Sequence, residues 1–164
     1  HRAHCPVMLI PAGTHSMFPR TVVCGTDRSP ESTVALRWAA EEAALRGVTL
    51  MAVEAQRRQP NARPLSDWVQ AQKLSAETTV LCQTEPDRRP ARLLVDLAEE
   101  HGGLLVVGRH SQRGRRRSVS AQVSARTSVP TVVVPAEFIE SAGPCISGVA
   151  SAAARPKLDR LHRV

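Results

Sequence analysis

Short apolar runs alternate with helical patterns along most of this chain. The runs are rich in Val, Leu and Thr and are bounded by Gly, Pro or Asp, which is typical of buried β-strands. They cover residues 21–27, 48–55, 78–85, 103–108 and 130–135. The fourth run, GLLVVG, is apolar throughout, as expected of a strand that is covered on both faces of a parallel sheet. The pattern therefore predicts five strands of one parallel sheet.

Helical patterns occupy the intervals between these strands. The first helix is predicted to begin at Ser29-Pro30-Glu31, because Ser caps helices, Pro fits the first turn and Glu suits the positive end of the helix dipole. Gly47 is expected to end it. Further helices are predicted over 65–76, 88–101 and 118–128. This alternation predicts an α/β fold with an open parallel five-stranded sheet and helices on both of its faces.

The beginning of the chain resembles a later segment. Residues 1–11, HRAHCPVMLIP, and residues 125–135, ARTSVPTVVVP, both end in Pro, four apolar or β-favouring residues, and Pro. We interpret the match as an internal repeat, in which residues 1–12 are the remnant last strand of a preceding domain; a chance match is the alternative. Residues 13–20 then form a linker, 21–136 the domain, and 137–164 a largely unstructured tail with weak periodicity.

Charge and composition narrow the possible partners. The chain has 22 basic and 15 acidic residues, a net charge of +7. An Arg-rich composition is typical of GC-rich bacterial genomes, and it also suits an anionic partner such as phosphate or nucleic acid. Aromatic residues make up only 2%, which disfavours nucleic-acid binding by base stacking. No apolar run reaches the length of a membrane helix and no signal-peptide pattern is seen, so we expect a cytoplasmic location without membrane contact.

Few residues suggest catalysis or metal binding. Cys24 and Cys82 lie inside apolar runs and are predicted to be buried, and no Cys or His spacing fits a metal motif. His110 and Ser111 are adjacent, but the GxSxG turn of a serine hydrolase is missing. We expect a protein without catalytic residues or a metal.

Three segments resemble the universal stress protein family over roughly residues 20–136. They are VVCGTDRSPESTVALRWAAEEAALRG at 22–47, LLVVGRHSQRG at 104–114 and SVSAQVSARTSVPTVVVP at 118–135. The resemblance implies a sheet whose five strands are ordered 3-2-1-4-5, so that the first and fourth are neighbours. Ligands of open α/β sheets bind beyond such a reversal of winding. The resemblance further implies a non-enzymatic stress-response role, with adenine-nucleotide (ATP) binding and dimerisation; slow ATP hydrolysis stays open.

The nucleotide site is carried over from the resemblance residue by residue. In ATP-binding members an Asp at the end of the first strand lies beside adenosine, and the second strand frames adenine; Asp27 and Val53 match these places. Asp27 could instead cap the following helix or turn. The family's phosphate loop contributes glycines, a final Ser or Thr, and backbone N–H groups. The full candidate set is Asp27, Val53, Gly108, Ser111, Gly114, Ser118, Val119 and Ser120.

The phosphate loop departs from the family pattern, which runs Gly, two residues, Gly, nine residues, Gly, then Ser or Thr. Ser111 and Arg117 replace the second and third glycines, and the loop is four residues shorter; Arg28 also replaces the glycine that usually follows the Asp. Side chains there hinder a backbone cradle for phosphate. Five arginines could bind phosphate instead: Arg109, Arg113, Arg115, Arg116 and Arg117. We expect either weak, salt-sensitive nucleotide binding or a lost site with a solvated basic loop.

Two other functions stay open at this stage. One is a ligand-free dimerisation or interaction module of the same fold, and the other is a basic protein that associates with nucleic acid, which the missing helix-turn-helix signal disfavours. Members of the family commonly associate through their last strand, so self-association or tandem-domain association is expected there. Residues 6–11 should then lie antiparallel beside 130–135 as a sixth strand.

Overall fold

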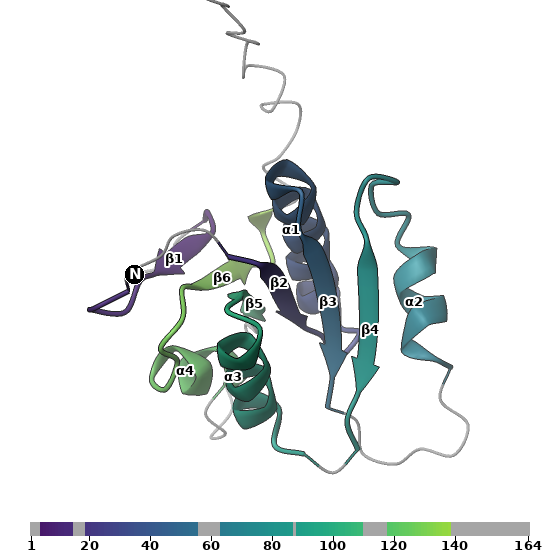
Figure 1. Ribbon diagram of the computed structural model, residues 1–164. Helices are drawn as coiled ribbons and strands as arrows, with labels where there is room; N and C mark the ends of the chain where they lie inside the picture. The colour runs from purple at the N-terminus through teal and green to yellow at the C-terminus, as the bar shows by residue number, and fades with distance from the viewer. Residues whose placement is uncertain (1–3, 15–18, 56–62, 87, 110–117, 139–164) are drawn as a thin grey trace, which may run out of the picture.

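Six strands form one sheet in the order β1-β6-β5-β2-β3-β4 (Figure 1). The computed structural model describes residues 4–14, 19–55, 63–86, 88–109 and 118–138. The strands are β1 (Val7–Leu9), β2 (Thr21–Gly25), β3 (Thr49–Glu54), β4 (Val80–Thr84), β5 (Leu104–Arg109) and β6 (Thr131–Pro135). Strands β2 to β6 run parallel and follow the expected 3-2-1-4-5 order. The predicted parallel sheet is confirmed, and β1 adds a sixth, antiparallel strand.

Four helices cover the two faces of this sheet. They are α1 (Pro30–Arg46), α2 (Leu65–Ala71), α3 (Pro90–Glu100) and α4 (Val119–Ser124). Helices α1 and α2 pack on one face, and α3 and α4 on the other. Helix α1 begins and ends as predicted, because the Ser29 side chain accepts the Ser32 N–H and Gly47 adopts φ 63°. Helices α2 and α4 are shorter than their sequence patterns predict.

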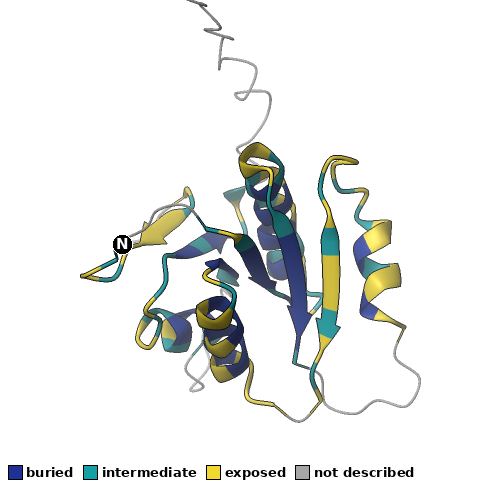
Figure 2. Cartoon of the chain, viewed as in Figure 1, coloured by how far each residue is buried: buried dark blue, intermediate teal, exposed yellow. Residues whose placement is uncertain are grey.

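The core consists of two apolar layers separated by the central strands. On the α1 face, Ala35, Ala39 and Ala43 are fully buried, and their small side chains let the helix lie close to the sheet. On the other face, Leu94 of α3 and Val123 of α4 pack against β2 and β5. Figure 2 shows the buried residues concentrated in the central strands and the inner helix faces.

The two edge strands are far more exposed than the centre. On β4, Leu81 is 53% exposed and Cys82 is also exposed, so the prediction that Cys82 is buried is wrong. An edge position together with the short helix α2 leaves this strand partly uncovered. Cys24 on the central strand β2 is fully buried as predicted, and burial raises the pKa of its thiol to about 12.

Strand β1 pairs with the last parallel strand as the sequence repeat suggested. Val7 lies opposite Val133, and Leu9 lies opposite Thr131, in an antiparallel register. The predicted sixth strand is therefore confirmed. Its three residues are each close to 40% exposed, and the next residue, Ile10, is 52% exposed. Strand β1 thus leaves apolar side chains at an edge of the sheet, where Figure 2 shows the strand as exposed.

No described helix combines the length and the apolar composition that crossing a lipid bilayer would require.

Candidate functional site

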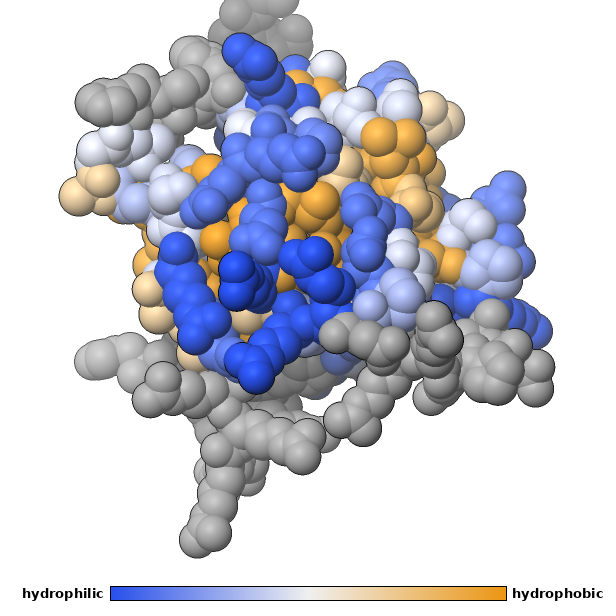
Figure 3. All heavy atoms as spheres, turned by 60° about the horizontal axis from the view of Figure 1, so that its bottom comes forward, coloured by the Kyte–Doolittle hydropathy of each residue, from blue (hydrophilic) through white to orange (hydrophobic). Residues whose placement is uncertain are grey.

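A pocket of about 150 Å³ lies at the carboxyl ends of β2 and β5, which are neighbours in the sheet. This is where the winding of the sheet reverses, the usual ligand position in open α/β folds. Its walls come from the strand ends, the β2–α1 turn, and the first turns of α1, α3 and α4. The lining residues are Gly25, Thr26, Asp27, Ser32, Ala55, Pro90, Leu94, Val107, Gly108 and Val119. Figure 3 brings this end of the molecule forward and shows hydrophobic residues within a surround of hydrophilic ones.

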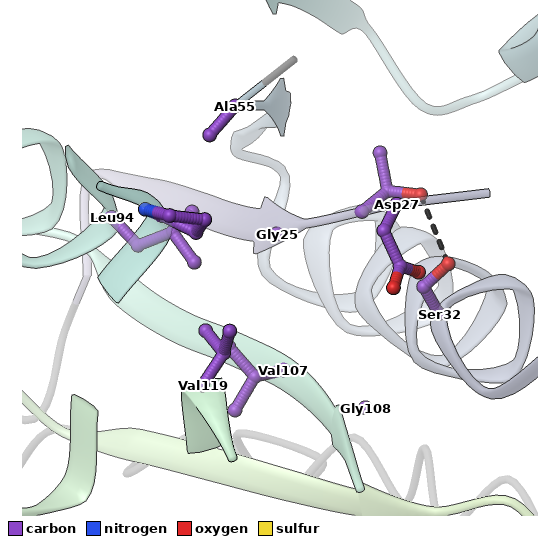
Figure 4. A pocket seen from close by; sticks show the side chains of 10 residues that line it. Gly25, Asp27, Ser32, Ala55, Leu94, Val107, Gly108 and Val119 are labelled. Atoms are coloured by element: carbon purple, nitrogen blue, oxygen red, sulfur yellow. Dashed lines mark hydrogen bonds between the residues drawn. The ribbon is translucent and has the colours of Figure 1, made fainter. Parts of the chain in front are cut away.

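One side of the pocket is apolar. Leu94, Val107 and Val119 come from α3, β5 and α4, and Ala55 follows β3 (Figure 4). At Gly25 a Cβ would lie 2.5 Å from Leu94 Cδ1, so glycine lets Leu94 pack over the end of β2. This side can take the flat, apolar faces of an aromatic ring system.

The opposite side is polar and is built from the turn between β2 and α1. The Ser29 N–H donates to Asp27 Oδ1 at 3.1 Å, and the Arg28 N–H donates to Thr26 Oγ1 at 3.0 Å. Thr26 Oγ1 also lies 3.1 Å from Ser32 Oγ, and Figure 4 shows Asp27 and Ser32 together across from the apolar wall. Both interpretations of Asp27 have support, because it lines the pocket and also accepts a hydrogen bond within the turn; the helix cap itself is Ser29.

An ion pair beside this turn had no counterpart in the sequence analysis. Arg28 donates from Nε and Nη2 to the two carboxylate oxygens of Glu54, each at 2.8 Å. The Glu54 side chain is only 6% exposed, and Arg28 holds a left-handed backbone with φ 63°. The pair joins the turn after β2 to the end of β3.

Val53 lies near the end of β3, the second parallel strand, opposite Gly25 of β2. Its side chain is 1% exposed and belongs to the core on the α3 side, and it is not part of the pocket lining. Its carbonyl accepts the Thr26 N–H at 2.8 Å. Ala55, two residues further on, lines the pocket instead. Whether Val53 meets a ligand stays a prediction.

The two ends of the phosphate loop lie beside the pocket. Gly108 lines it, and a Cβ there would lie 2.6 Å from the Glu31 carbonyl oxygen, so β5 and the first turn of α1 are in close contact. Ser118 caps α4 by accepting the Ala121 N–H at 3.2 Å, as predicted. Val119 lines the pocket, and Ser120 is buried with its hydroxyl 3.1 Å from that of Ser118.

The middle of the loop lies outside the described residues. This applies to Ser111, Gly114, Arg113, Arg115, Arg116 and Arg117. Arg109 is described, and its Nη2 lies 3.9 Å from Glu137 Oε2. In the described part of the chain, no group of three or more His, Cys, Asp or Glu side chains could hold a metal ion.

Known proteins match both the sequence and this fold. A model of the universal stress protein family matches residues 19–135. A universal stress protein solved in complex with cAMP is 28% identical, with a TM-score of 0.60, and the match covers 72% of this chain and 98% of that one. The universal stress protein from Archaeoglobus fulgidus solved in complex with dAMP is 22% identical, with a TM-score of 0.53 and coverage of 72% and 99%.

A longer protein matches a larger share of this chain. It is a universal stress protein from Archaeoglobus fulgidus DSM 4304, 19% identical with a TM-score of 0.58. The match covers 82% of this chain and 51% of that protein, so this chain spans about half of its length.

Proposed function

The chain belongs to the universal stress protein family, and from that premise we propose that it binds an adenine nucleotide weakly and acts as a regulator rather than as an enzyme. The observation that carries the proposal is the pocket at the reversal of winding, with an apolar wall facing Asp27. A relative that is 28% identical was solved with cAMP. A nucleobase fits the apolar wall, and the Asp27 carboxylate can accept hydrogen bonds from ribose hydroxyls.

The size of the pocket suggests which part of the nucleotide it takes. At about 150 Å³ it is smaller than the roughly 300–1,000 Å³ that holds a whole drug-sized ligand. The base and part of the ribose would occupy it, and the phosphates would extend towards the loop after β5. Because that loop has lost two of its glycines, we expect a Kd of tens of micromolar or weaker, on the order of −6 kcal/mol.

The pocket lining argues for binding without catalysis. Asp27 is the one carboxylate among the described lining residues, which include no His, Lys or Cys. General acid–base chemistry needs a second group positioned to move a proton. We therefore assign the site a regulatory role, in which the bound nucleotide reports on the state of the cell.

Calorimetric titration with AMP tests this function. The wild-type chain should bind AMP with a measurable heat and a Kd of tens of micromolar or weaker. Ala55→Leu fills the pocket and should reduce affinity by more than about tenfold, whereas Ala71→Leu, at an exposed position on α2, should leave it unchanged. If AMP, cAMP and ATP all fail to bind the folded wild-type chain, the ligand-free interaction module becomes the better account.

The exposed edge strand supports a second role, association with another domain of the same fold. Val7, Met8 and Leu9 repeat the pattern of β6 and pair with it, and they remain close to 40% exposed. The repeated pattern and the pairing support β1 as the last strand of a preceding domain, whose body would cover it.

Sedimentation at increasing concentration tests whether this edge also joins two copies of the chain. Met8→Lys should weaken any self-association, since a charge would replace an apolar contact at the edge. Leu81→Lys, on the opposite edge strand β4, is the matched control and should have no effect. A dimer that survives Met8→Lys, or one that Leu81→Lys disrupts, would contradict this assignment.

A further inference from the structure

Arg28 and Glu54 form an ion pair that is bidentate and largely buried, unlike a typical surface ion pair. Two parallel hydrogen bonds of 2.8 Å join the guanidinium to the carboxylate. The Glu54 side chain is 6% exposed and that of Arg28 is 21% exposed, so both are largely removed from water. A carboxylate buried to this degree depends on its partner, because losing the partner would leave an uncompensated charge. The two side chains therefore fix each other's position.

Arg28 pairs with Glu54 from a backbone conformation that residues with side chains rarely adopt. Its φ of 63° lies in the left-handed region, which costs conformational energy for any residue other than glycine. The ion pair and the hydrogen bond from the Arg28 N–H to Thr26 Oγ1 offset that cost. The turn is thus held by a contact of the Arg28 side chain and by a hydrogen bond of the Arg28 backbone.

This turn carries the one carboxylate of the described pocket lining. Asp27 directly precedes Arg28, and its Oδ1 accepts the Ser29 N–H at 3.1 Å. The backbone pairing of β2 and β3 extends only as far as the hydrogen bond from the Thr26 N–H to the Val53 carbonyl. Beyond that point, the Arg28–Glu54 pair ties the turn to β3.

We propose that the Arg28–Glu54 pair is a positioning device, which holds the Asp27 turn in the conformation that meets the ribose hydroxyls of a bound nucleoside. The inference rests on the nucleotide site proposed above. A carboxylate that is already in place binds hydroxyls without an ordering cost at the moment of binding. Arg28 and Glu54 act through Asp27, so they affect recognition of the ribose and leave recognition of the base unchanged.

Titration with adenosine and with free adenine tests this role. The double variant Arg28→Gln/Glu54→Gln removes the pair without leaving a buried charge, and Arg28→Gly/Glu54→Gln removes the backbone strain as well. Either variant should bind adenosine about tenfold more weakly and adenine as the wild type does. The matched control Arg46→Gln/Glu42→Gln removes an ion pair at the far end of α1 and should change neither affinity. Equal changes for adenosine and adenine, or adenosine affinity within twofold of wild type, would overturn the proposal.

Amide hydrogen exchange in the ligand-free chain separates this inference from the proposed function. The Arg28 and Ser29 amides should exchange about tenfold faster in the Gln/Gln variant than in the wild type, and the control variant should match the wild type. If the wild type binds neither adenosine nor adenine, the proposed function fails, but the exchange rates still show whether the ion pair holds the turn. Unchanged exchange at both amides would overturn the inference that the Arg28–Glu54 pair holds the turn.

Discussion

The two halves of the pocket are built from different kinds of contact. The half formed by the β2–α1 turn and the apolar wall is held by hydrogen bonds, a buried ion pair and core packing. The other half is bounded by Gly108 and Ser118 at the ends of the loop after β5, and the sequence between them has Ser111 and Arg117 at positions where the resemblance implies glycines. Under the proposed function, the first half would be preorganised for a nucleoside, whereas the second would lack the glycines that preorganise a phosphate cradle.

The two halves would contribute to affinity in different ways, one through a rigid turn and the other through charged side chains. Contacts made by a rigid turn cost little ordering on binding, and they discriminate by shape and hydrogen bonding. Contacts made by arginine side chains act mainly through charge, are screened by salt and accept many anions. We therefore expect the nucleoside part of a ligand to supply most of its binding energy, with phosphates adding a smaller, salt-dependent increment.

The largest expected effect is on stability, at the point where the two halves meet. Gly108→Ala would place a Cβ 2.6 Å from the Glu31 carbonyl oxygen, and a backbone atom cannot move aside as a side chain can. We expect the free energy of unfolding to fall by about 2–3 kcal/mol in urea denaturation. Gly47→Ala, which strains the end of α1 without a steric clash, should cost less. Equal losses at the two sites would show that the Gly108 contact is not close.

Removing the Asp27 carboxylate should weaken binding of the nucleoside part of the ligand. Asp27→Ala should reduce adenosine affinity by roughly tenfold or more, because hydrogen bonds to a charged group are worth about 1.5–3 kcal/mol. Stability should change by under about 1 kcal/mol, since the hydrogen bond between the Ser29 N–H and Asp27 Oδ1 is exposed. Asp67→Ala, on the exposed side of α2, is the binding control. Unaltered adenosine binding in the Asp27 variant would assign that residue to the turn alone.

A smaller loss of stability, together with weaker binding, is expected from a change at the apolar wall. Gly25→Ala would place a Cβ 2.5 Å from Leu94 Cδ1, the end of a flexible side chain that can rotate away. The stability cost should be about 1 kcal/mol. Because Leu94 lines the pocket, adenosine and adenine should both bind severalfold more weakly in calorimetric titrations. Loss of adenosine binding alone would place the base elsewhere.

The smallest effect is expected from the phosphate half. Replacing Arg115, Arg116 and Arg117 by Ala should weaken ATP binding by less than about tenfold at low salt and leave adenosine binding unchanged. The difference from wild type should disappear at about 0.5 M salt. Replacing Arg37, Arg46 and Arg126 by Ala changes the net charge equally and serves as the control, because these residues are exposed and lie outside the loop after β5. A larger loss than this would mean that the arginines form a defined phosphate site.

Local sequence signals were sufficient for the fold but only partly for the site. The caps at Ser29 and Gly47 and the pairing expected for residues 6–11 each depend on a few neighbouring residues, and the structure confirms the caps and an antiparallel strand at Val7–Leu9. The Arg28–Glu54 pair joins residues 26 apart in the chain, and no periodicity marks such a contact. The pocket lining includes Ala55, which follows β3, and the apolar run over 48–55 does not show where that strand ends. Exposure of Cys82 depends on which strand is at the sheet edge and on how short α2 is.

The comparison of the affinities of adenosine, AMP and ATP tests the central claim most directly. All three should be measured by calorimetry on the same preparation of the wild-type chain, at about 0.15 M salt. If the nucleoside half supplies most of the binding, their Kd values should lie within about tenfold of one another, each at tens of micromolar or weaker. ATP binding more than a hundredfold tighter than adenosine binding would contradict the account, because it would mean that the loop after β5 still forms a preorganised phosphate cradle.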